Sequence, residues 1–322
     1  MRSHVSRAIA IVGVGARFPG APDLETFWKK ILARETAVRE VPEGRWPISP
    51  TALLDPEGRP DRLRSIRGCY LDLPEGVGEP SHWLAGVLAE EAWASAGFGE
   101  AERERASVVL ANIVLPTPET SRFTRETLGK AFEAWALGRK APPVDVPPPL
   151  FATAGAARAA VERLGLGGGG FTLDAACASS LFAIHLACLE LEGGRVVAVL
   201  AGGLSLPDSL YTQVGFTQLR ALSPSGRCLP FDRRADGLVV GEGGALFALP
   251  RLEDAVAEGR TLLGVIRGIG LSNDLGGSLL SPESEGQLRA MRAAYEEAGW
   301  DPEEVDLVEC HGTGTPRGDE VE

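Results

Sequence analysis

Short, continuously apolar segments alternate with segments of helical periodicity along the whole sequence. Strands that are apolar on both faces have to be covered by helices on both faces of a sheet, so this alternation predicts an α/β protein. The expected strands are residues 8–12, 108–113, 171–174, 196–200, 244–249, 262–269 and 305–310. The expected helices are residues 81–98, 151–164, 284–299 and the apolar stretch after Cys177, and Gly97 is the expected C-cap of the first.

A short likeness between two segments indicates an internal duplication. The segments AEEAWASAGF (89–98) and AAYEEAGW (293–300) both end in Ala-Gly-aromatic, and each precedes an expected strand. A repeated strand–helix–strand unit is typical of a protein built from two similar halves. We therefore expect a tail at residues 1–7, a first half at 8–255 and only the beginning of a second half at 256–322.

Three segments rich in glycine or proline are expected to be loops. Residues 41–64 combine proline, glycine and charge, which is typical of a surface loop. The segment KAPPVDVPPPL (140–150) predicts a stiff loop, and GLGGGG (165–170) predicts a flexible turn. The glycine run lacks the Lys-Ser/Thr pair that a phosphate-binding loop requires.

The first apolar segment excludes two common functions. Arginines followed by apolar residues at 1–16 imitate a secretory signal, but two glycines inside the short apolar run favour a buried strand. The GVGARF that follows has Phe18 where a dinucleotide-binding turn requires its third glycine. A bulky ring there would prevent close packing of a helix on the strand, so we expect no nucleotide site.

Composition narrows the class of protein further. A net charge of −12 argues against a nucleic-acid partner, which requires a basic face, and against an anionic membrane surface. No apolar run approaches the roughly 18 residues that a membrane span needs. The five cysteines have neither the spacing of a disulfide framework nor that of a metal site, so we expect a cytoplasmic protein without a bound metal.

The segment DAACASSL (174–181) places one thiol, Cys177, between an expected strand and an expected helix. The dipole and the free N–H groups at a helix N-terminus stabilise a thiolate and can hold a developing oxyanion. The neighbouring alanines and serines leave room for a substrate chain, so Cys177 is a candidate acyl nucleophile. An inert cysteine packed in the core explains the same residues, as we expect for Cys188, and this segment alone leaves both possibilities open.

His311 is the candidate catalytic partner. It follows the expected strand 305–310, and active groups of α/β proteins gather at such strand ends. The Gly-Thr-Gly-Thr run after it offers backbone N–H groups and two hydroxyls to a polar, extended ligand. A histidine that merely caps the turn is the alternative. The other histidines are expected in the tail, on the surface and too far along the Cys177 helix to reach the sulfur: His4, His82 and His185.

Four motifs in order resemble the β-ketoacyl synthase family. They are IAIVGVGARFPGAPDLETFWKKI (9–31), DAACASSL (174–181), GFTQLRALSPSGRCLPFDRRADGLVVGEGG (215–244) and HGTGTPRGDEVE (311–322). The likeness covers nearly the whole chain and is greatest to ketosynthase domains of type I polyketide synthases and related multidomain lipid synthases. Several specific motifs in the same order are not expected by chance.

The resemblance implies a thiolase-type fold, in which two similar α/β halves stack as α-β-α-β-α layers, and a homodimer. It also implies a decarboxylative Claisen condensation. An acyl group moves from an acyl carrier protein to Cys177, and a malonyl-type thioester on the carrier's phosphopantetheine arm then loses CO₂ and attacks it. No directly bound cofactor is implied, and acyltransferase and carrier domains are expected in the same longer polypeptide.

The resemblance further implies roles for residues that match the family's motifs. His311 would donate a hydrogen bond to the thioester carbonyl of the extender and stabilise the enolate. Thr313 and Thr315 would bind the pantetheine arm. Supporting positions are Phe231 and Asp232 in a loop near the site, and Asp319 and Glu322 in the Gly-Asp-x-x-Glu motif.

Some features of the family are missing from this sequence. The lysine, the second histidine and the Gly-Phe-Gly loop of the later motifs are absent, so we expect the 322-residue chain alone to be inactive. EPSHWL (79–84) replaces the usual Asp-Pro-Gln-Gln-Arg, and GGGGFT (167–172) replaces the usual segment before the strand. These two changes resemble synthases of the polyunsaturated fatty-acid or glycolipid type.

Two other functions compete with a condensing enzyme. The first is a degenerate ketosynthase that only dimerises or holds carrier proteins, but relatives that have lost condensation usually replace the cysteine. The second is a thiolase, whose final base would be a further cysteine that these residues do not reach. A basic stretch could dock an acidic carrier, although a solvated loop is the alternative. Its members are Arg59, Arg62, Arg64 and Arg67.

Overall fold

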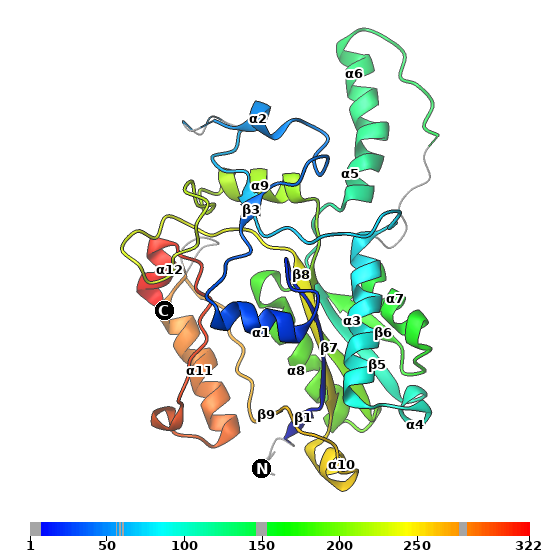
Figure 1. Ribbon diagram of the computed structural model, residues 1–322, viewed down its shortest axis with the longest axis vertical. Coiled ribbons are helices and arrows are strands. Elements are labelled where there is room, and N and C mark those ends of the chain that lie inside the picture. The colour runs from blue at the N-terminus through cyan, green and yellow to red at the C-terminus, as the bar shows by residue number, and fades with distance from the viewer. Residues whose placement is uncertain (1–7, 56, 58, 60, 146–152, 277–281) are drawn as a thin grey trace.

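A five-stranded mixed sheet in the order β2-β8-β7-β5-β6 forms the centre of the molecule (Figure 1). The computed structural model describes residues 8–55, 57, 59, 61–145, 153–276 and 282–322. The strands of the sheet are β2 (Gly13–Arg17), β5 (Ala106–Asn112), β6 (Gly170–Leu173), β7 (Ala198–Ser205) and β8 (Gly243–Pro250). β5 runs parallel to β6 and β7, whereas β8 runs antiparallel to β7 and β2.

Helices cover both faces of this sheet, as its apolar strands require. α3 (Pro80–Ala96) and α7 (Gly155–Leu164) pack on one face, and α8 (Ser179–Glu192) packs on the other. Every residue of β5 is buried between the two apolar layers. α3 starts with a proline, whose missing N–H is not needed in the first turn, and it ends at Gly97 in the left-handed conformation. The predicted α/β architecture and the predicted cap are confirmed.

The first apolar segment forms two strands instead of one strand and a turn. β1 (Ile9–Ile11) pairs antiparallel with β9 (Gly264–Ile266), and β2 continues into the main sheet beside β8. The glycines of GVGARF let β2 approach α3 closely, since a Cβ at Gly15 would lie 2.8 Å from the backbone nitrogen of Ala92. Close packing of the strand on the helix explains these glycines.

The same contact occurs a second time near the C-terminus of the chain. α11 (Ser284–Ala298) ends at Gly299 with a φ of 67°, and Gly97 after α3 has a φ of 64°. A Cβ at Gly270 would lie 2.7 Å from the backbone nitrogen of Ala294 in α11, just as Gly15 does with α3. The likeness between the two segments therefore extends from sequence to backbone conformation and to a close approach of a glycine to the helix, although Gly270 lies beyond the end of β9.

Shorter elements surround these layers. The further helices are α1 (Leu24–Leu32), α2 (Pro50–Leu53), α4 (Glu100–Arg103), α5 (Pro118–Thr124), α6 (Lys130–Ala136), α9 (Ser209–Gln218), α10 (Leu252–Ala257) and α12 (Pro316–Val321). β3 (Arg39–Glu40) pairs with β4 (Arg67–Gly68), and single 3₁₀ turns lie at Ala176–Ala178 and Pro302–Glu304. α5, a π-helical turn at Arg125–Gly129 and α6 form an arm that projects from the body (Figure 1) and that sequence analysis did not predict.

The expected strand at 305–310 is wrong. These residues pair with no strand in the described part of the chain, and Leu307 is 81% exposed and Val308 59%. A strand needs a neighbour to satisfy its backbone N–H and C=O groups, and apolar composition alone does not supply one. The expected strand at 262–269 is likewise shorter, because only β9 has a partner.

Two expected loops contribute to the packing instead. Residues 41–64 contain α2 and bury Trp46, Leu53 and Leu63 around Tyr70, so the segment 41–71, an excursion between α1 and α3, has a small core of its own. The glycine run 165–170 is not a flexible turn. Gly167 and Gly168 lie so close to the backbone before β5 that a Cβ would collide with the carbonyls of Glu104 and Ala106.

Several predicted features fall partly outside the described residues. The tail 1–7, the prolines of the loop 140–150 and the first two residues of the predicted helix 151–164 are among them. Of the helices that are described, none combines the length and the apolarity needed to cross a membrane. Within the same residues, no three side chains of His, Cys, Asp or Glu form a group that could hold a metal ion.

Candidate active site

Cys177 stands at a strained turn between β6 and α8. Ala176, the residue before it, has a φ of +52°, a left-handed conformation that disfavours any residue with a Cβ. Asp174 stabilises the turn, because its Oδ1 accepts the N–H of Ala176 at 2.8 Å and its Oδ2 accepts the N–H of Val114 at 2.8 Å. The thiol is thereby presented to solvent at the edge of the sheet.

Ser179 closes the same turn from the helix side. Its hydroxyl accepts the N–H of Ala175 at 2.8 Å and donates to the carbonyl of Ala176 at 2.6 Å. From the sequence, the serines after the cysteine were expected only to leave space, because they are small. The hydrogen bonds give this buried serine a second role, since they fix the backbone on both sides of the strained residue.

His311 lies beside the sulfur although 134 positions separate the two residues in the sequence. A side-chain hydrogen bond with His311 lowers the pKa of Cys177, although burial acts in the opposite direction. The same hydrogen bond raises the pKa of His311, against the effect of its own burial, and Glu322 adds to the rise. Each partner favours the charged form of the other, so the geometry supports a thiolate–imidazolium pair.

The turn after His311 has the shape that its glycines predict. Gly312 and Gly314 have φ values of 59° and 68°, and the hydroxyls of Thr313 and Thr315 are hydrogen-bonded to each other at 3.0 Å. Glu322 closes the turn by accepting the N–H of Gly312 at 3.1 Å. The structure thus brings together His311, both threonines and one of the predicted supporting carboxylates.

The loop before β8 holds this turn in place. The N–H of Gly237 donates to the carbonyl of Gly314 at 3.0 Å, and the thiol of Cys228 lies 3.7 Å from the carbonyl of Gly312. Asp319 accepts the N–H of Phe231 at 2.7 Å, which supports this phenylalanine in an unusual left-handed conformation with a φ of 60°. Phe231 and Asp319 therefore lie against each other.

Asp232 has a different environment from the other predicted site residues. It forms an ion pair with Arg234 at 2.7 Å, and hydrogen bonds from Arg234 lower its pKa strongly. This carboxylate is therefore ionised and engaged within its own loop. No hydrogen bond joins it to Cys177 or to His311 in the part of the chain that the structure describes.

A cavity of about 610 Å³ adjoins Cys177 on the α8 side of the sheet. Its floor is a row of small residues on three adjacent strands, because Ala111 on β5 pairs with Gly203 on β7, which pairs with Ala245 on β8. Leu181 and Ile184 from α8 line the opposite wall. Each residue of the row lacks a large side chain, so a long apolar group can extend across the strands from the thiol.

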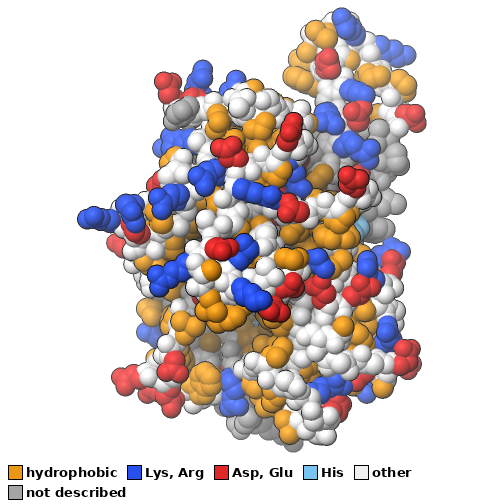
Figure 2. All heavy atoms as spheres, in the orientation of Figure 1, with side chains coloured by type: hydrophobic (Ala, Val, Ile, Leu, Met, Phe, Trp, Pro, Cys, Tyr) orange, Lys and Arg blue, Asp and Glu red, His pale blue; other side chains and the backbone are white. Residues whose placement is uncertain are grey.

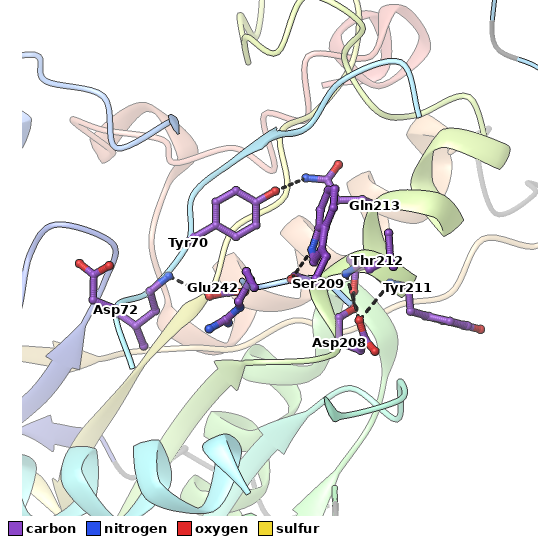
Figure 3. A network of polar contacts seen from close by, with 12 residues as sticks. Tyr70, Asp72, Asp208, Ser209, Tyr211, Thr212, Gln213 and Glu242 are labelled. Atoms are coloured by element: carbon purple, nitrogen blue, oxygen red, sulfur yellow. Dashed lines mark hydrogen bonds and ion pairs between the residues drawn. The ribbon is translucent and has the colours of Figure 1, made fainter. Parts of the chain in front are cut away.

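Glu242 is a site residue that sequence analysis missed. It lies in the cavity wall just before β8, and its carboxylate is buried. Figure 3 shows it close to Tyr70 and Ser209, where it accepts the backbone N–H of Leu71. It stands in the VVGEGG part of a motif that the sequence displays, but its burial and partners depend on residues about 170–200 positions away.

Comparisons with known proteins agree with this geometry. Residues 6–255 match the family model "Beta-ketoacyl synthase, N-terminal domain", and residues 263–322 match "Beta-ketoacyl synthase, C-terminal domain". The chain is 35% identical over its whole length to a mycocerosic acid synthase-like polyketide synthase of Mycolicibacterium smegmatis. Over 98% of its length it is 32% identical to the methylphloroacetophenone synthase of Cladonia uncialis. It spans only 15% and 12% of those two proteins.

Solved structures give the same result. The PfaC keto synthase–chain length factor superposes on 98% of the chain with a TM-score of 0.88 and 29% identity, and 37% of that structure is covered. The ketosynthase from module 6 of the bacillaene synthase from Bacillus subtilis 168 gives a TM-score of 0.79 and 28% identity over 98% of this chain and 52% of its own. The predicted thiolase-like fold is confirmed by these neighbours.

Proposed function

The chain belongs to the β-ketoacyl synthase family, and from this membership we propose that it forms carbon–carbon bonds as the ketosynthase part of a longer polyketide synthase. Cys177 would take an acyl group from an acyl carrier protein. A malonyl-type extender on the carrier's phosphopantetheine would then condense with it to give a β-ketoacyl chain. The single observation that carries this proposal is the placement of His311 beside Cys177, where each side chain favours the charged form of the other.

The first half-reaction needs a nucleophile and a place for negative charge. The Cys177 thiolate attacks the carbonyl carbon of the acyl thioester, a new C–S bond forms, and the carrier thiolate leaves and takes up a proton. Ala175 and Ala176 already donate their N–H groups to Ser179 and Asp174. The N–H groups of Ala178 and Ser179 donate to the carbonyls of Ala175 and Ala176. The N–H of Cys177 itself would therefore hold the oxyanion.

The second half-reaction makes use of His311. The extender loses CO₂, and its electron pair becomes an enolate whose oxygen accepts a hydrogen bond from the imidazole. The enolate carbon attacks the carbonyl of acyl-Cys177, the C–S bond to the enzyme breaks, and the thiolate is regenerated. Thr313 and Thr315, on the turn after His311, would bind the pantetheine arm, while Phe231, Asp232, Asp319 and Glu322 would support the loop around it.

The cavity beside Cys177 would hold the acyl chain during both steps. Its small-residue floor and its apolar wall on α8 suit an aliphatic group. A degenerate ketosynthase or a thiolase is not favoured, because the nucleophile, the histidine and the pantetheine turn are assembled at one place. No directly bound cofactor or metal enters the proposed reaction.

Mapping of the acyl adduct tests the proposal. The longer polypeptide is incubated with an acyl-loaded carrier, and its peptides are analysed by mass spectrometry. We expect the adduct on Cys177 and none after Cys177→Ala. Cys188→Ala is the matched control, because Cys188 is on the same helix but buried, and burial raises its pKa to about 12. An adduct that persists in Cys177→Ala would contradict the proposal.

The carrier protein would approach over a basic surface at the mouth of the site. Arg64 and Arg67 are exposed and form no ion pair with any described carboxylate, whereas Arg59 pairs with Asp55. The side chain of Arg67 lies against Gly226, which begins the loop that carries Arg227 and Arg233 toward the His311 turn. Figure 2 shows several basic side chains on the left side of the molecule, in the orientation of Figure 1.

Charge reversal tests this docking surface. We expect Arg64→Glu with Arg67→Glu to raise the KM for the carrier and leave kcat unchanged, because the residues do not touch the reacting groups. The control is Arg105→Glu. Arg105 is exposed and immediately precedes β5, at the opposite end of that strand from the cavity. An equal change of KM in the control would mean that net charge and not this surface is responsible.

A homodimer would cover two surfaces that the chain leaves open. β6 pairs with β5 along one edge only within the described residues, and Phe171 on it is 43% exposed. The helical arm also exposes an apolar face, formed by Leu128, Phe132 and Trp135. Unpaired strand edges and apolar faces favour association. Sedimentation velocity of the wild type and of Phe171→Asp measures whether β6 forms the interface.

The remaining parts of the proposal concern the larger protein. We propose a first half at 8–255 that carries the nucleophile, the beginning of a second half at 256–322, and a cytoplasmic location. Acyltransferase and carrier domains would belong to the same polypeptide. We further propose that the 322-residue chain alone does not complete the condensation, because its similarity covers only about half or less of the solved ketosynthase chains.

A further inference from the structure

Glu242 is a buried carboxylate in the wall of the catalytic cavity for which the proposed reaction has no use. Its residue is 9% exposed, and burial raises its pKa, against the influence of Arg45 and of a backbone N–H. A charge in such a place is retained only if partners hold it firmly. The partners of Glu242 therefore indicate what it does.

Three contacts tie Glu242 to the excursion that precedes α3. One carboxylate oxygen accepts from the guanidinium of Arg45 at 2.8 Å, and the other accepts the N–H of Leu71 at 2.8 Å. The backbone N–H of Glu242 donates to the carbonyl of Cys69 at 2.9 Å. Figure 3 shows the carboxylate between the excursion and the start of β8.

The excursion is itself fixed to the rest of the molecule. Trp46, next to Arg45, is buried and donates to the hydroxyl of Ser209 at the start of α9 at 3.0 Å. Gln213 on the same helix is fully buried and donates to the hydroxyl of Tyr70 at 3.0 Å. Glu242 thus binds to a part of the structure that cannot shift without breaking buried hydrogen bonds.

On its other side, Glu242 ends the loop that supports the His311 turn. This loop, residues 227–241, contacts the turn through Cys228, Phe231 and Gly237. These are the hydrogen bonds that the described residues place between the turn and the first half of the chain. The position of Glu242, where this loop joins β8, therefore determines the position of His311 relative to Cys177.

We infer that Glu242 is a positioning residue. It binds Arg45 and the backbone of Leu71, which fixes the end of the 227–241 loop. The loop in turn holds the His311 turn in place beside Cys177. Glu242 touches neither reacting group and acts through the loop. The inference rests on the proposed function only in that Cys177 and His311 are the pair being aligned. Contact between them can be measured without any condensation activity.

The reactivity of Cys177 toward iodoacetamide reports this contact. The rate of alkylation of the Cys177 peptide in the full polypeptide is measured by mass spectrometry as a function of pH. Thiolate is the reacting species, and in the wild type His311 favours it. The groups that act on the pair are His311 and Glu322. His311→Ala gives the full size of the effect when the contact is lost.

Glu242→Gln keeps the shape of the side chain but removes its charge. We expect the midpoint of Cys177 alkylation to rise by a substantial part of the His311→Ala shift, with alkylation about 3–10-fold slower at neutral pH. Glu102→Gln is the matched control, because Glu102 forms a similarly buried pair with Arg260 at 2.5 Å, away from the loop. It should lower stability and leave the midpoint unchanged.

An unchanged midpoint in Glu242→Gln, with a loss of thermal stability like that of Glu102→Gln, would overturn the inference and leave Glu242 a merely structural residue. Absence of any shift of the Cys177 alkylation midpoint in His311→Ala would overturn the inference as well, since there would be no contact between His311 and Cys177 for Glu242 to maintain. If Glu242→Gln does not fold, Arg45→Lys replaces it and should shift the midpoint in the same direction. Failure of the proposed function appears separately, as an acyl adduct that does not map to Cys177.

Discussion

The segment that follows α3 and the segment that follows α11 begin alike and end differently. Both helices stop at a left-handed glycine, Gly97 and Gly299, and an aromatic residue comes next in each case. After α3 the chain forms β5, which is buried along its entire length between two partner strands. After α11 the corresponding residues 305–310 are largely exposed and pair with no described strand.

The shared part of the two segments depends on contacts within a few residues. A glutamate three residues on accepts the backbone N–H that follows each helix, from Gly99 to Glu102 at 2.8 Å and from Asp301 to Glu304 at 3.0 Å. The part that differs depends on distant neighbours, because a strand is stable only beside another strand. Local motifs are thus reproduced wherever their sequence recurs, and strands are not.

The two segments that carry Cys177 and His311 also differ in how they position these residues. The first positions Cys177 through one tight turn, in which Asp174 accepts the N–H of Ala176 and Ser179 donates to the carbonyl of Ala176. The second presents His311 on a turn that depends on the 227–241 loop of the first half. One partner is therefore positioned by its own element and the other by tertiary contacts, and the following substitutions test this difference.

The largest effect is expected for Cys177→Ala in the first half. Removal of the nucleophile eliminates the covalent intermediate, so both acyl transfer to the enzyme and condensation should be lost completely in the longer polypeptide. Radiolabelled acyl-carrier and malonyl-carrier substrates measure the two steps separately. Condensation that persists at a measurable rate would place the nucleophile elsewhere.

A smaller and more selective effect is expected for His311→Ala in the second half. The enolate loses a hydrogen-bond donor, so decarboxylation and condensation should fall by about 10²–10³-fold. Acylation of Cys177 should be retained, although slower at neutral pH because the thiolate is less favoured. The matched variant His185→Ala, on α8, should change neither step. Equal losses of acylation and decarboxylation in His311→Ala would be inconsistent with separate roles for the two halves.

Two glycine substitutions compare the stability of the halves directly. Gly15→Ala places a methyl group against the backbone of α3, and Gly270→Ala does the same with α11. We expect Gly15→Ala to lower the free energy of unfolding by about 1–3 kcal/mol. We expect Gly270→Ala to open mainly the contact with α11, as measured by hydrogen exchange, with less effect on thermal unfolding. Equal effects on global unfolding would show that the halves unfold as one unit.

The smallest effect is expected for the glutamates after the two helices. Glu102→Gln should cost about 1 kcal/mol at neutral pH, and Glu304→Gln less, because only Glu102 also pairs with an arginine. Burial raises the pKa of Glu102, but the N–H of Gly99 and Arg260 lower it further, so its folded value lies below the ordinary 4.5. Its contribution is then present above pH 4.5 and is lost as pH falls through the folded pKa. Urea unfolding at several pH values should show the difference between wild type and Glu102→Gln vanish in acid.

Sequence motifs predicted which residues meet beside the cavity better than they predicted the residues that hold them in place. Cys177 and His311 stand in short segments whose residue types suit a nucleophile and a hydrogen-bond donor, and the structure joins them. The supporting roles of the Ser179 hydroxyl and the Glu242 carboxylate were not predicted, although both residues belong to motifs that resemble the family. Their roles depend on which backbone groups lie beside them after folding, and residue type does not show that.

The sequence by itself determined the α/β class, the covered central strands and the ends of α3 and α11, because periodicity and caps act over a few residues. Only the tertiary structure decided that 13–17 is a strand, that 305–310 is not, and that 41–64 encloses a core around Tyr70. It also decided that Arg45 and Glu242 form an ion pair at the wall of the cavity beside Cys177. Strand pairing and the burial of charge depend on residues that are far apart in the chain. These residues become neighbours only when the chain folds.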